Sequence, residues 1–502
     1  MKRLVLGVGA VVALGGIAGL SACGVGTDCD FGLCAGSPAD ADADGGLDGE
    51  VPDATKPPDC DDTADPTSEA AKGCVVDSFA LFVDGDAGDD ANNGSKEKPF
   101  KKIATAIGQV GSTGKRRIYI CGSGTYAEHL KLTTAASLHG GFACSTWAPD
   151  NTAKPKVAPT DPGYALHIDN VAAAVTVSDL ELVAPDVGAL KDGTSSIAVF
   201  ANTSNVSFLR AALRAQNGAE GAPGEAGKPG EVTSPGGLDG NPASGGTGAP
   251  SKTCTCSSST TATKGGAGGT ETGGGPGEPN YGGAAPNNGS PGAFGGGSCG
   301  ADSLGKNGAD APAADDAAPT GALGDLSDNG WRPAKGADAT ENGKPGQGGG
   351  GGGARSNTTG GSGGGCGGCG GFAGKGSGGG GASIAVLVYE STVALAASTL
   401  EAKSAGAGGT AGAGGEGSAG GEGGSVGACP GGNGGRGADG GAGAGGAGGV
   451  ATGILFKGAE PTVDAETTIA QGEAGAGGKG GTSPTNDGPI GVAGKTLDAS
   501  KL

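Results

Sequence analysis

Two carboxylates in an apolar-alternating segment have a spacing that suits acid–base chemistry. Asp179 and Glu181 are two positions apart, so on a strand both side chains lie on one face, where paired carboxylates can cleave glycosidic bonds. Arg210 follows Asp179 by 31 residues, which is the period of an internal repeat, and is expected beside it on the next strand. A solvated ion pair between strands is the simpler interpretation, so we predict no catalytic pair here.

Metal and redox chemistry have equally little support. The three histidines, His129, His139 and His167, have no cysteine, histidine or aspartate neighbour at metal-ligand spacing. Cys366 and Cys369 match a C-x-x-C pattern, but they lie among glycines without the strand–helix context of redox proteins. We expect disulfide partners at these two positions, and the sequence predicts no catalytic residue, no metal and no cofactor.

The N-terminus has the pattern of an export signal. A basic start at residues 2–3 precedes an apolar run over residues 4–20, and the sequence Leu-Ser-Ala-Cys follows and ends at Cys23. This ending resembles the lipobox of bacterial lipoproteins. The resemblance implies cleavage before Cys23 and attachment of a lipid to its sulfur, and Gly24 in place of Asp implies the outer membrane. An ordinary secreted protein or a retained anchor is the alternative.

Twelve cysteines follow Cys23, and an even number in an exported chain suggests disulfides. Sequence proximity favours three pairs, although the connectivity does not follow from the sequence: Cys29–Cys34, Cys60–Cys74 and Cys121–Cys144. The remaining cysteines could pair Cys254 or Cys256 with Cys299, and Cys366 or Cys369 with Cys429.

The composition bounds the class of protein. Glycine accounts for 117 of 502 residues and aromatic residues for only 3%, which excludes an ordinary globular enzyme over the whole length. The net charge of −20 argues against nucleic acid as a partner, because phosphates need a basic surface. Residues 23–78 are acidic and rich in proline, which predicts an extended tether.

The first elements after the tether have a familiar order. An apolar strand near residues 81–83 is followed by an Asp/Asn/Gly-rich turn, a short amphipathic helix after Pro99, and a strand over residues 117–121. This order resembles the opening of bacterial right-handed parallel β-helix proteins, in which such a helix caps the first rung.

An internal repeat points to the same fold. The first copy has apolar residues at Leu166, Ile168, Val175, Val177 and Leu182, and adding 31, then 187, then 70 gives the matching positions of three further copies. A single copy cannot bury its own apolar face, so neighbouring copies must stack. We therefore predict an all-β fold: a right-handed parallel β-helix with an N-terminal capping helix and long Gly-rich insertions.

The insertions leave after the same point of each copy, so we expect them to emerge side by side. The predicted divisions are 1–22 signal peptide, 23–78 tether, 79–215 first rungs, 216–382 Gly-rich insertion, 383–403 rung, 404–450 Gly-rich insertion, 451–470 rung and 471–502 Gly-rich tail. Glycine at every third position admits a collagen-like helix, a flexible linker, or a single-chain bundle of three-residue helices that exchange backbone hydrogen bonds. The common exit point favours the bundle.

The Gly-Gly-X-rich pattern of the insertions resembles mycobacterial PGRS domains. The combination of lipobox, acidic tether, β-helix and Gly-rich insertions is similar to exported lipoproteins of myxobacteria. We expect a non-enzymatic, surface-exposed outer-membrane lipoprotein whose lipid anchor holds it to the membrane. It would serve adhesion, contact with extracellular matrix or surface structuring. The alternative is a polysaccharide-binding module or a degenerate glycan lyase, and flat contacts with ice are a third interpretation.

Overall fold

The structure is a computed structural model that describes residues 54–150, 152, 154–281, 288–426 and 428–502. The expected signal peptide, Cys23 and the expected Cys29–Cys34 disulfide lie outside these residues. Within the described ranges, no helix is both long and apolar enough to cross a membrane.

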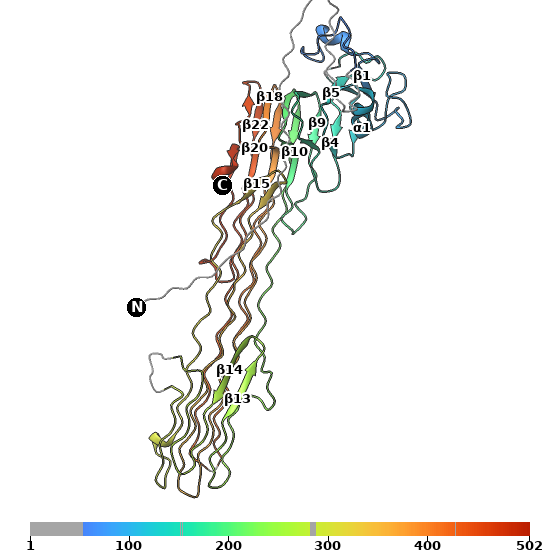
Figure 1. Ribbon diagram of the computed structural model, residues 1–502. Helices are drawn as coiled ribbons and strands as arrows, with labels where there is room; N and C mark the ends of the chain where they lie inside the picture. The colour runs from blue at the N-terminus through green and yellow to red at the C-terminus, as the bar shows by residue number, and fades with distance from the viewer. Residues whose placement is uncertain (1–53, 151, 153, 282–287, 427) are drawn as a thin grey trace, which may run out of the picture. The chain divides into compact units, whose positions relative to one another are not determined.

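Three large parallel sheets carry the core of the described chain (Figure 1). The first contains, in spatial order, β1 (Ala80–Val83), β2 (Arg117–Cys121), β5 (Ser137–Phe142), β8 (Val175–Ser178), β11 (Asn205–Leu209), β18 (Thr392–Ala396) and β21 (Thr462–Val463). The second contains β23 (Ala493–Asp498), β20 (Ala451–Lys457), β17 (Ser383–Tyr389), β10 (Ser196–Asn202), β7 (Leu166–Asp169) and β4 (Leu130–Leu132). The third contains β22 (Thr468–Ala470), β19 (Thr399–Glu401), β12 (Ala212–Arg214), β9 (Glu181–Val183), β6 (Lys156–Val157) and β3 (Thr125–Tyr126).

The three sheets share one apolar core. Its largest cluster joins Phe208 of the first sheet, Val199 of the second and Leu213 of the third, all fully buried. These positions alternate with outward-facing ones along each strand, which is the pattern that buries one face of a sheet. A second cluster lies on the other face of the second sheet, where Trp331 of the hairpin β15 (Gly324–Ser327)–β16 (Gly330–Pro333) covers Phe200.

The predicted helix is present as α1 (Ile103–Thr113). Its buried side includes Ile103 and Val110, whereas Phe100 precedes the helix and forms a β-bridge with Val83. The carboxylate of Glu128 accepts hydrogen bonds from the first backbone N–H groups, at 3.1 Å from Ile103 N. A distant side chain therefore satisfies groups that a local cap residue usually serves.

The predicted right-handed parallel β-helix is wrong as the fold of this chain. The described residues form three parallel sheets with few helices and no closed solenoid. The sheets differ in strand number, since β1 and β2 have partners in the first sheet only. Between β12 and β17, and again between β19 and β20, the chain leaves the sheets through Gly-rich segments, so no continuous wall joins the third sheet to the second.

These Gly-rich segments are ordered and lie side by side (Figure 1). Segment 218–230 donates hydrogen bonds from Gly221, Gly224 and Gly227 to carbonyls of segment 404–416, each at 2.8 Å. Segment 370–381 runs antiparallel to segment 218–230, and its backbone N–H groups donate to carbonyls of that segment, again at every third residue. The period of three is that of a polyproline II helix, which has no internal hydrogen bonds and is left to bond with its neighbours. We call the described Gly-rich segments that are hydrogen-bonded to one another in this way, within residues 216–382, 404–450 and 471–491, the glycine bundle.

The bundle is a continuation of the sheets. The hydrogen bond from Ala215 N to Glu401 O follows the β12–β19 pair, and Gly218 N to Ser404 O extends it with the same offset of 186 residues. Gly221 N to Ala407 O continues the series. The parallel register of the third sheet therefore sets the register of the bundle.

Close approach of the chains requires glycine at the contact positions. A Cβ atom on Gly412 would overlap the carbonyl oxygen of Glu225, and one on Gly227 would overlap that of Phe372. A hairpin of β13 (Lys252–Cys256) and β14 (Ser259–Gly265) lies against the bundle. The short 3-10 turns are η1 (Glu69–Cys74), η2 (Ala301–Ser303) and η3 (Ala499–Lys501).

Candidate functional site

The two carboxylates predicted to lie on one face each form an ion pair with a different arginine. Asp179 lies between β8 and β9 with φ of 53°, and Arg210 Nη2 donates to its Oδ2 at 2.7 Å. Glu181 on β9 pairs with Arg214, at 3.2 Å between Oε1 and Nε. The expected Asp179–Arg210 pair therefore exists, but it is not a freely solvated pair, because the Asp179 side chain is only 4% exposed while that of Arg210 is 27% exposed.

Arg210 also attaches the segment before the first strand. Its Nη2 lies 2.9 Å from Asp65 Oδ1, and the Arg210 guanidinium is the main reason that the pKa of Asp65 falls to about 2. Residues 54–78, assigned to the tether from sequence, contain η1 and the Cys60–Cys74 disulfide. We call this segment the N-terminal strap.

A cavity of about 1020 Å³ lies between the strap and the outer face of the first sheet. We call it the sheet groove. Strand register aligns one row of outward-facing side chains across six neighbouring strands on its floor: Arg117, Ser137, Thr176, Ser207, Ala394 and Thr462. Four hydroxyl-bearing side chains and one alanine follow the arginine along this row, so the row is polar.

One end of the groove contains two buried side chains, those of the charged Arg117 and the neutral His139. Arg117 is 8% exposed and donates to two neutral oxygens, Tyr119 Oη at 3.2 Å and Asp62 O at 3.1 Å. His139 is 1% exposed; its Nδ1 lies 3.0 Å from Ser178 Oγ, and its Nε2 has no hydrogen-bond partner. Burial, helped by the nearby Arg117 charge, lowers the pKa of His139 well below its usual range, so its ring is neutral.

Sequence reasoning missed this row, although a signal was present. Thr176 stands between two buried valines, and Ser207 occupies the matching position one repeat later. Outward positions of paired strands form a continuous surface, so reading the polar half of the repeat reveals the floor. The strap that covers it could not be found in this way, because it carries no repeat.

The other two histidines have structural contacts. His129 Nδ1 lies 2.8 Å from the backbone oxygen of Tyr164. His167 stacks on Phe200, with 4.9 Å between ring centroids. Within the described residues, neither belongs to a group of metal-ligating side chains.

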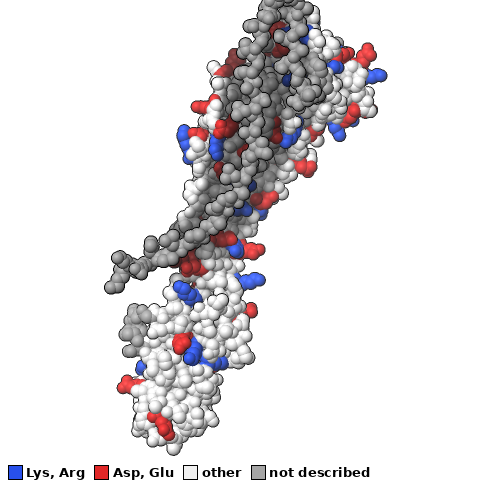
Figure 2. Space-filling view, in the orientation of Figure 1, with Lys and Arg blue, Asp and Glu red and all other residues white. Residues whose placement is uncertain are grey.

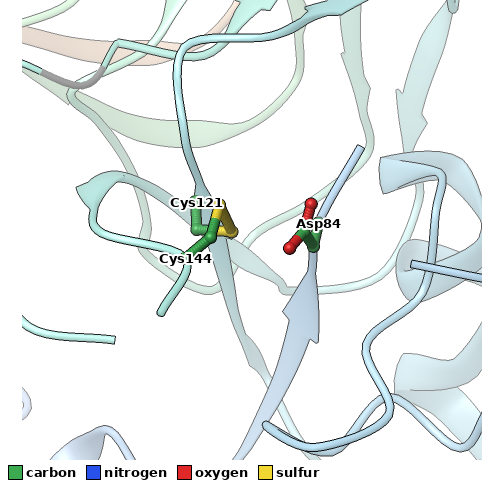
Figure 3. A group of neighbouring side chains, drawn as sticks. All are labelled: Asp84, Cys121 and Cys144. Carbon is green, nitrogen blue, oxygen red and sulfur yellow. A yellow bond between two sulfur atoms is a disulfide. The ribbon is translucent and has the colours of Figure 1, made fainter. Parts of the chain in front are cut away.

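A possible metal-ligating group is closed by a disulfide. Asp84 lies beside Cys121 and Cys144, whose sulfurs are bonded to each other (Figure 3). Sulfurs joined in this way are not the thiolates that bind metals. Asp84 instead accepts backbone N–H groups of the following turn, at 2.9 Å from Asp86 N.

Two of the three disulfide bonds favoured by sequence proximity are present in the described residues, but the pairings named as possible for the later cysteines are wrong. Cys60–Cys74 and Cys121–Cys144 pair as sequence proximity favours. In the glycine bundle, distant segments come together, and the bonds are Cys254–Cys366, Cys256–Cys369 and Cys299–Cys429. The two cysteines of the C-x-x-C pattern thus attach the bundle to β13, as disulfide partners.

Comparisons with known proteins add little. No protein-family model matches the chain, and no curated protein matches it. A solved structure that matches is the crystal structure of the GH136 lacto-N-biosidase from Eubacterium ramulus, as its selenomethionine derivative, with 14% sequence identity and a TM-score of 0.21. The match covers 27% of this chain and 26% of that chain, about a quarter of each.

Proposed function

We propose that this protein is a lipid-anchored component of a bacterial outer membrane that presents the glycine bundle as a non-enzymatic contact surface. In this function the lipid on Cys23 holds the chain to the membrane, and the bundle makes contact with neighbouring cells or extracellular matrix. The observation that carries the proposal is the order of the bundle. A flexible Gly-rich linker would not repeat backbone hydrogen bonds at every third residue through several segments.

The chemistry of the bundle suits a structural role. Backbone atoms, glycines and small buried side chains such as Ala444 and Ser377 occupy its interior, and the larger charged side chains lie at its surface. Figure 2 shows few charged side chains over the Gly-rich part on the face in view. The uncharged stretches of this face (Figure 2) favour contact through shape and hydrogen bonding over long-range electrostatic attraction.

Cell fractionation tests the anchor and the address. We expect the wild-type protein in the outer-membrane fraction and its bundle to be cut by protease added to intact cells. The Cys23→Ala variant should leave that fraction, because the lipid is lost. Wild-type protein found in the soluble fraction would overturn the proposed anchor. Wild-type protein that protease cuts only after lysis would overturn the proposed surface exposure.

A second candidate function, polysaccharide binding, is favoured by the sheet groove with its row of hydroxyl groups. A panel of glycans separates binding from catalysis. We expect retention of unmodified glycan, and turnover that disappears in a groove variant would show that the protein is an enzyme.

A further inference from the structure

We propose that the sheet groove binds a linear, carboxylate-bearing glycan, with one carboxylate placed against Arg117. We call the Arg117 end of the groove, where Asp62 of the strap accepts a hydrogen bond from Arg117, the strap end. This inference deepens the second candidate function, since it names the site and the class of ligand. It is independent of the contact function of the glycine bundle, which involves other residues.

The shape of the floor selects a linear ligand. Arg117 and Thr462 are the ends of a row that crosses six strands. Five spacings of about 4.8 Å between strands give a length of roughly 24 Å. The exposed Ser207 lies in the middle of this row, between Thr176 and Ala394. Short side chains leave room above the floor, and hydroxyl groups offer hydrogen bonds to a polyhydroxylated chain.

The strap end selects an anionic group. Arg117 is buried and held by neutral oxygens, so its positive charge remains available to a ligand that enters the cavity. Arginine binds planar carboxylates through paired, charge-assisted hydrogen bonds. His139 lines the same cavity and has a buried Nε2 without a hydrogen-bond partner, which a hydroxyl group of the ligand would satisfy.

The carboxylates around the groove have direct partners other than Arg117, although Asp62, whose pKa is lowered mainly by the hydrogen bond from Lys56, lies near enough for the Arg117 charge to help lower it. Asp62 pairs with Lys56 at 2.7 Å, and Asp65 pairs with Arg210. Asp464, at the opposite end, accepts the backbone N–H groups of Ala397 and Thr467. The acidic lining is therefore occupied by neighbours of its own, and the charge of the strap end is complementary to an acidic ligand.

Titration calorimetry on the full-length protein in detergent tests the inference with two probes of equal length. The probes are an oligogalacturonate and a neutral gluco-oligosaccharide. We expect the oligogalacturonate to bind at least tenfold more tightly, and its affinity to fall as salt rises. Equal affinity for both probes would overturn the acidic class while leaving polysaccharide binding in place. Binding of neither probe would overturn the inference and the second candidate function together.

Matched substitutions locate the site. Ser207→Tyr fills the middle of the floor from an exposed position and should weaken oligogalacturonate binding at least tenfold. Thr399→Tyr is the control, because Thr399 is also an exposed strand residue but lies on the third sheet, and it should change affinity less than twofold. Unchanged affinity in Ser207→Tyr would show that the ligand binds elsewhere.

The role of Arg117 has a separate readout. Arg117→Gln should remove the preference for the acidic probe, and Arg117→Lys should retain part of it because the charge remains. Thermal unfolding of both variants checks that the buried site still folds. If Arg117→Gln does not fold, the salt dependence of wild-type binding still decides whether the ligand carboxylate is recognised by charge. A preference that survives Arg117→Gln in folded protein would contradict the assignment.

Discussion

At the scale of single residues, Arg210 joins the strap to the sheets. Its guanidinium binds both the buried Asp179 and the more exposed Asp65. Arg210→Ala leaves the Asp179 carboxylate buried without its partner, so we expect a loss of about 2 to 4 kcal/mol in the free energy of unfolding. Arg214→Ala is the matched control, since its partners are at least 29% exposed and its loss should be below about 1 kcal/mol. Urea denaturation measures both, and equal losses would contradict this ranking.

Asp65 gives the strap a defined pH dependence. Its pKa is lowered from 3.8 to about 2, mainly by the hydrogen bond from Arg210. A carboxylate whose pKa is lower in the folded state than in the unfolded state stabilises the folded state. Its contribution is complete at a pH above the unfolded pKa and is lost as the pH falls from about 4 toward 2. We expect the wild-type melting temperature to fall more steeply over this range than that of Asp65→Asn. Parallel curves for the two proteins would show that Asp65 does not contribute.

At the scale of elements, the bundle segments depend on glycine at the contact positions. Gly412 is buried, donates to Lys375 O at 2.9 Å, and leaves no room for a Cβ atom beside Glu225. Gly412→Ala must push two segments apart, and we expect a cost of about 1 to 3 kcal/mol. Gly321→Ala should be neutral, because nothing lies within 4 Å of its Cβ position. Hydrogen exchange of the bundle amides compares the two, and equal protection would contradict the tight contact.

Strand pairing shows how far the sequence repeat could be used. The offset of 187 residues places Ile197 beside Ile384 and Leu213 beside Leu400, as predicted. The predicted offset of 31 residues holds in the first and third sheets but fails in the second, where Leu166 pairs with Val199 and not with Ile197. A shift of two residues keeps the same side chains facing inward, so hydrophobic alternation cannot detect it.

Other features had no repeat or periodicity to reveal them. The hairpin β15–β16 lies within a segment predicted to be Gly-rich throughout, and Trp331 brings it onto the second sheet. The strand β23 occupies part of the predicted Gly-rich tail. Both elements are short, and their partners are distant in sequence, so tertiary contacts decide their conformation where local propensity is weak.

At the scale of the whole described chain, the sheets act as the template for the bundle. The Gly-rich excursions leave after β12, β19 and β22 in the third sheet and return to β17, β20 and β23 in the second. Strands that are paired in register deliver their following segments in register, which explains why the hydrogen-bond offset between β12 and β19 continues into the glycines. The apolar core thus supplies stability that glycine, with no side chain to bury, cannot supply itself.

Disulfides should consequently matter more to the bundle than to the sheets. Cys254–Cys366 and Cys256–Cys369 close segments with sequence separations of 112 and 113 residues, and loops of this length are worth about 4 to 5 kcal/mol each in the chain-entropy account, without being additive. We expect the double substitution Cys256→Ser/Cys369→Ser to raise hydrogen exchange in the bundle around β13 while β10 and β17 stay protected by their apolar core. Breaking Cys60–Cys74 by the same substitution is the control and should loosen only the strap. Uniform loosening of sheets and bundle in the first variant would mean that the two unfold as one unit, and the template would then depend on the bundle as much as the bundle depends on it.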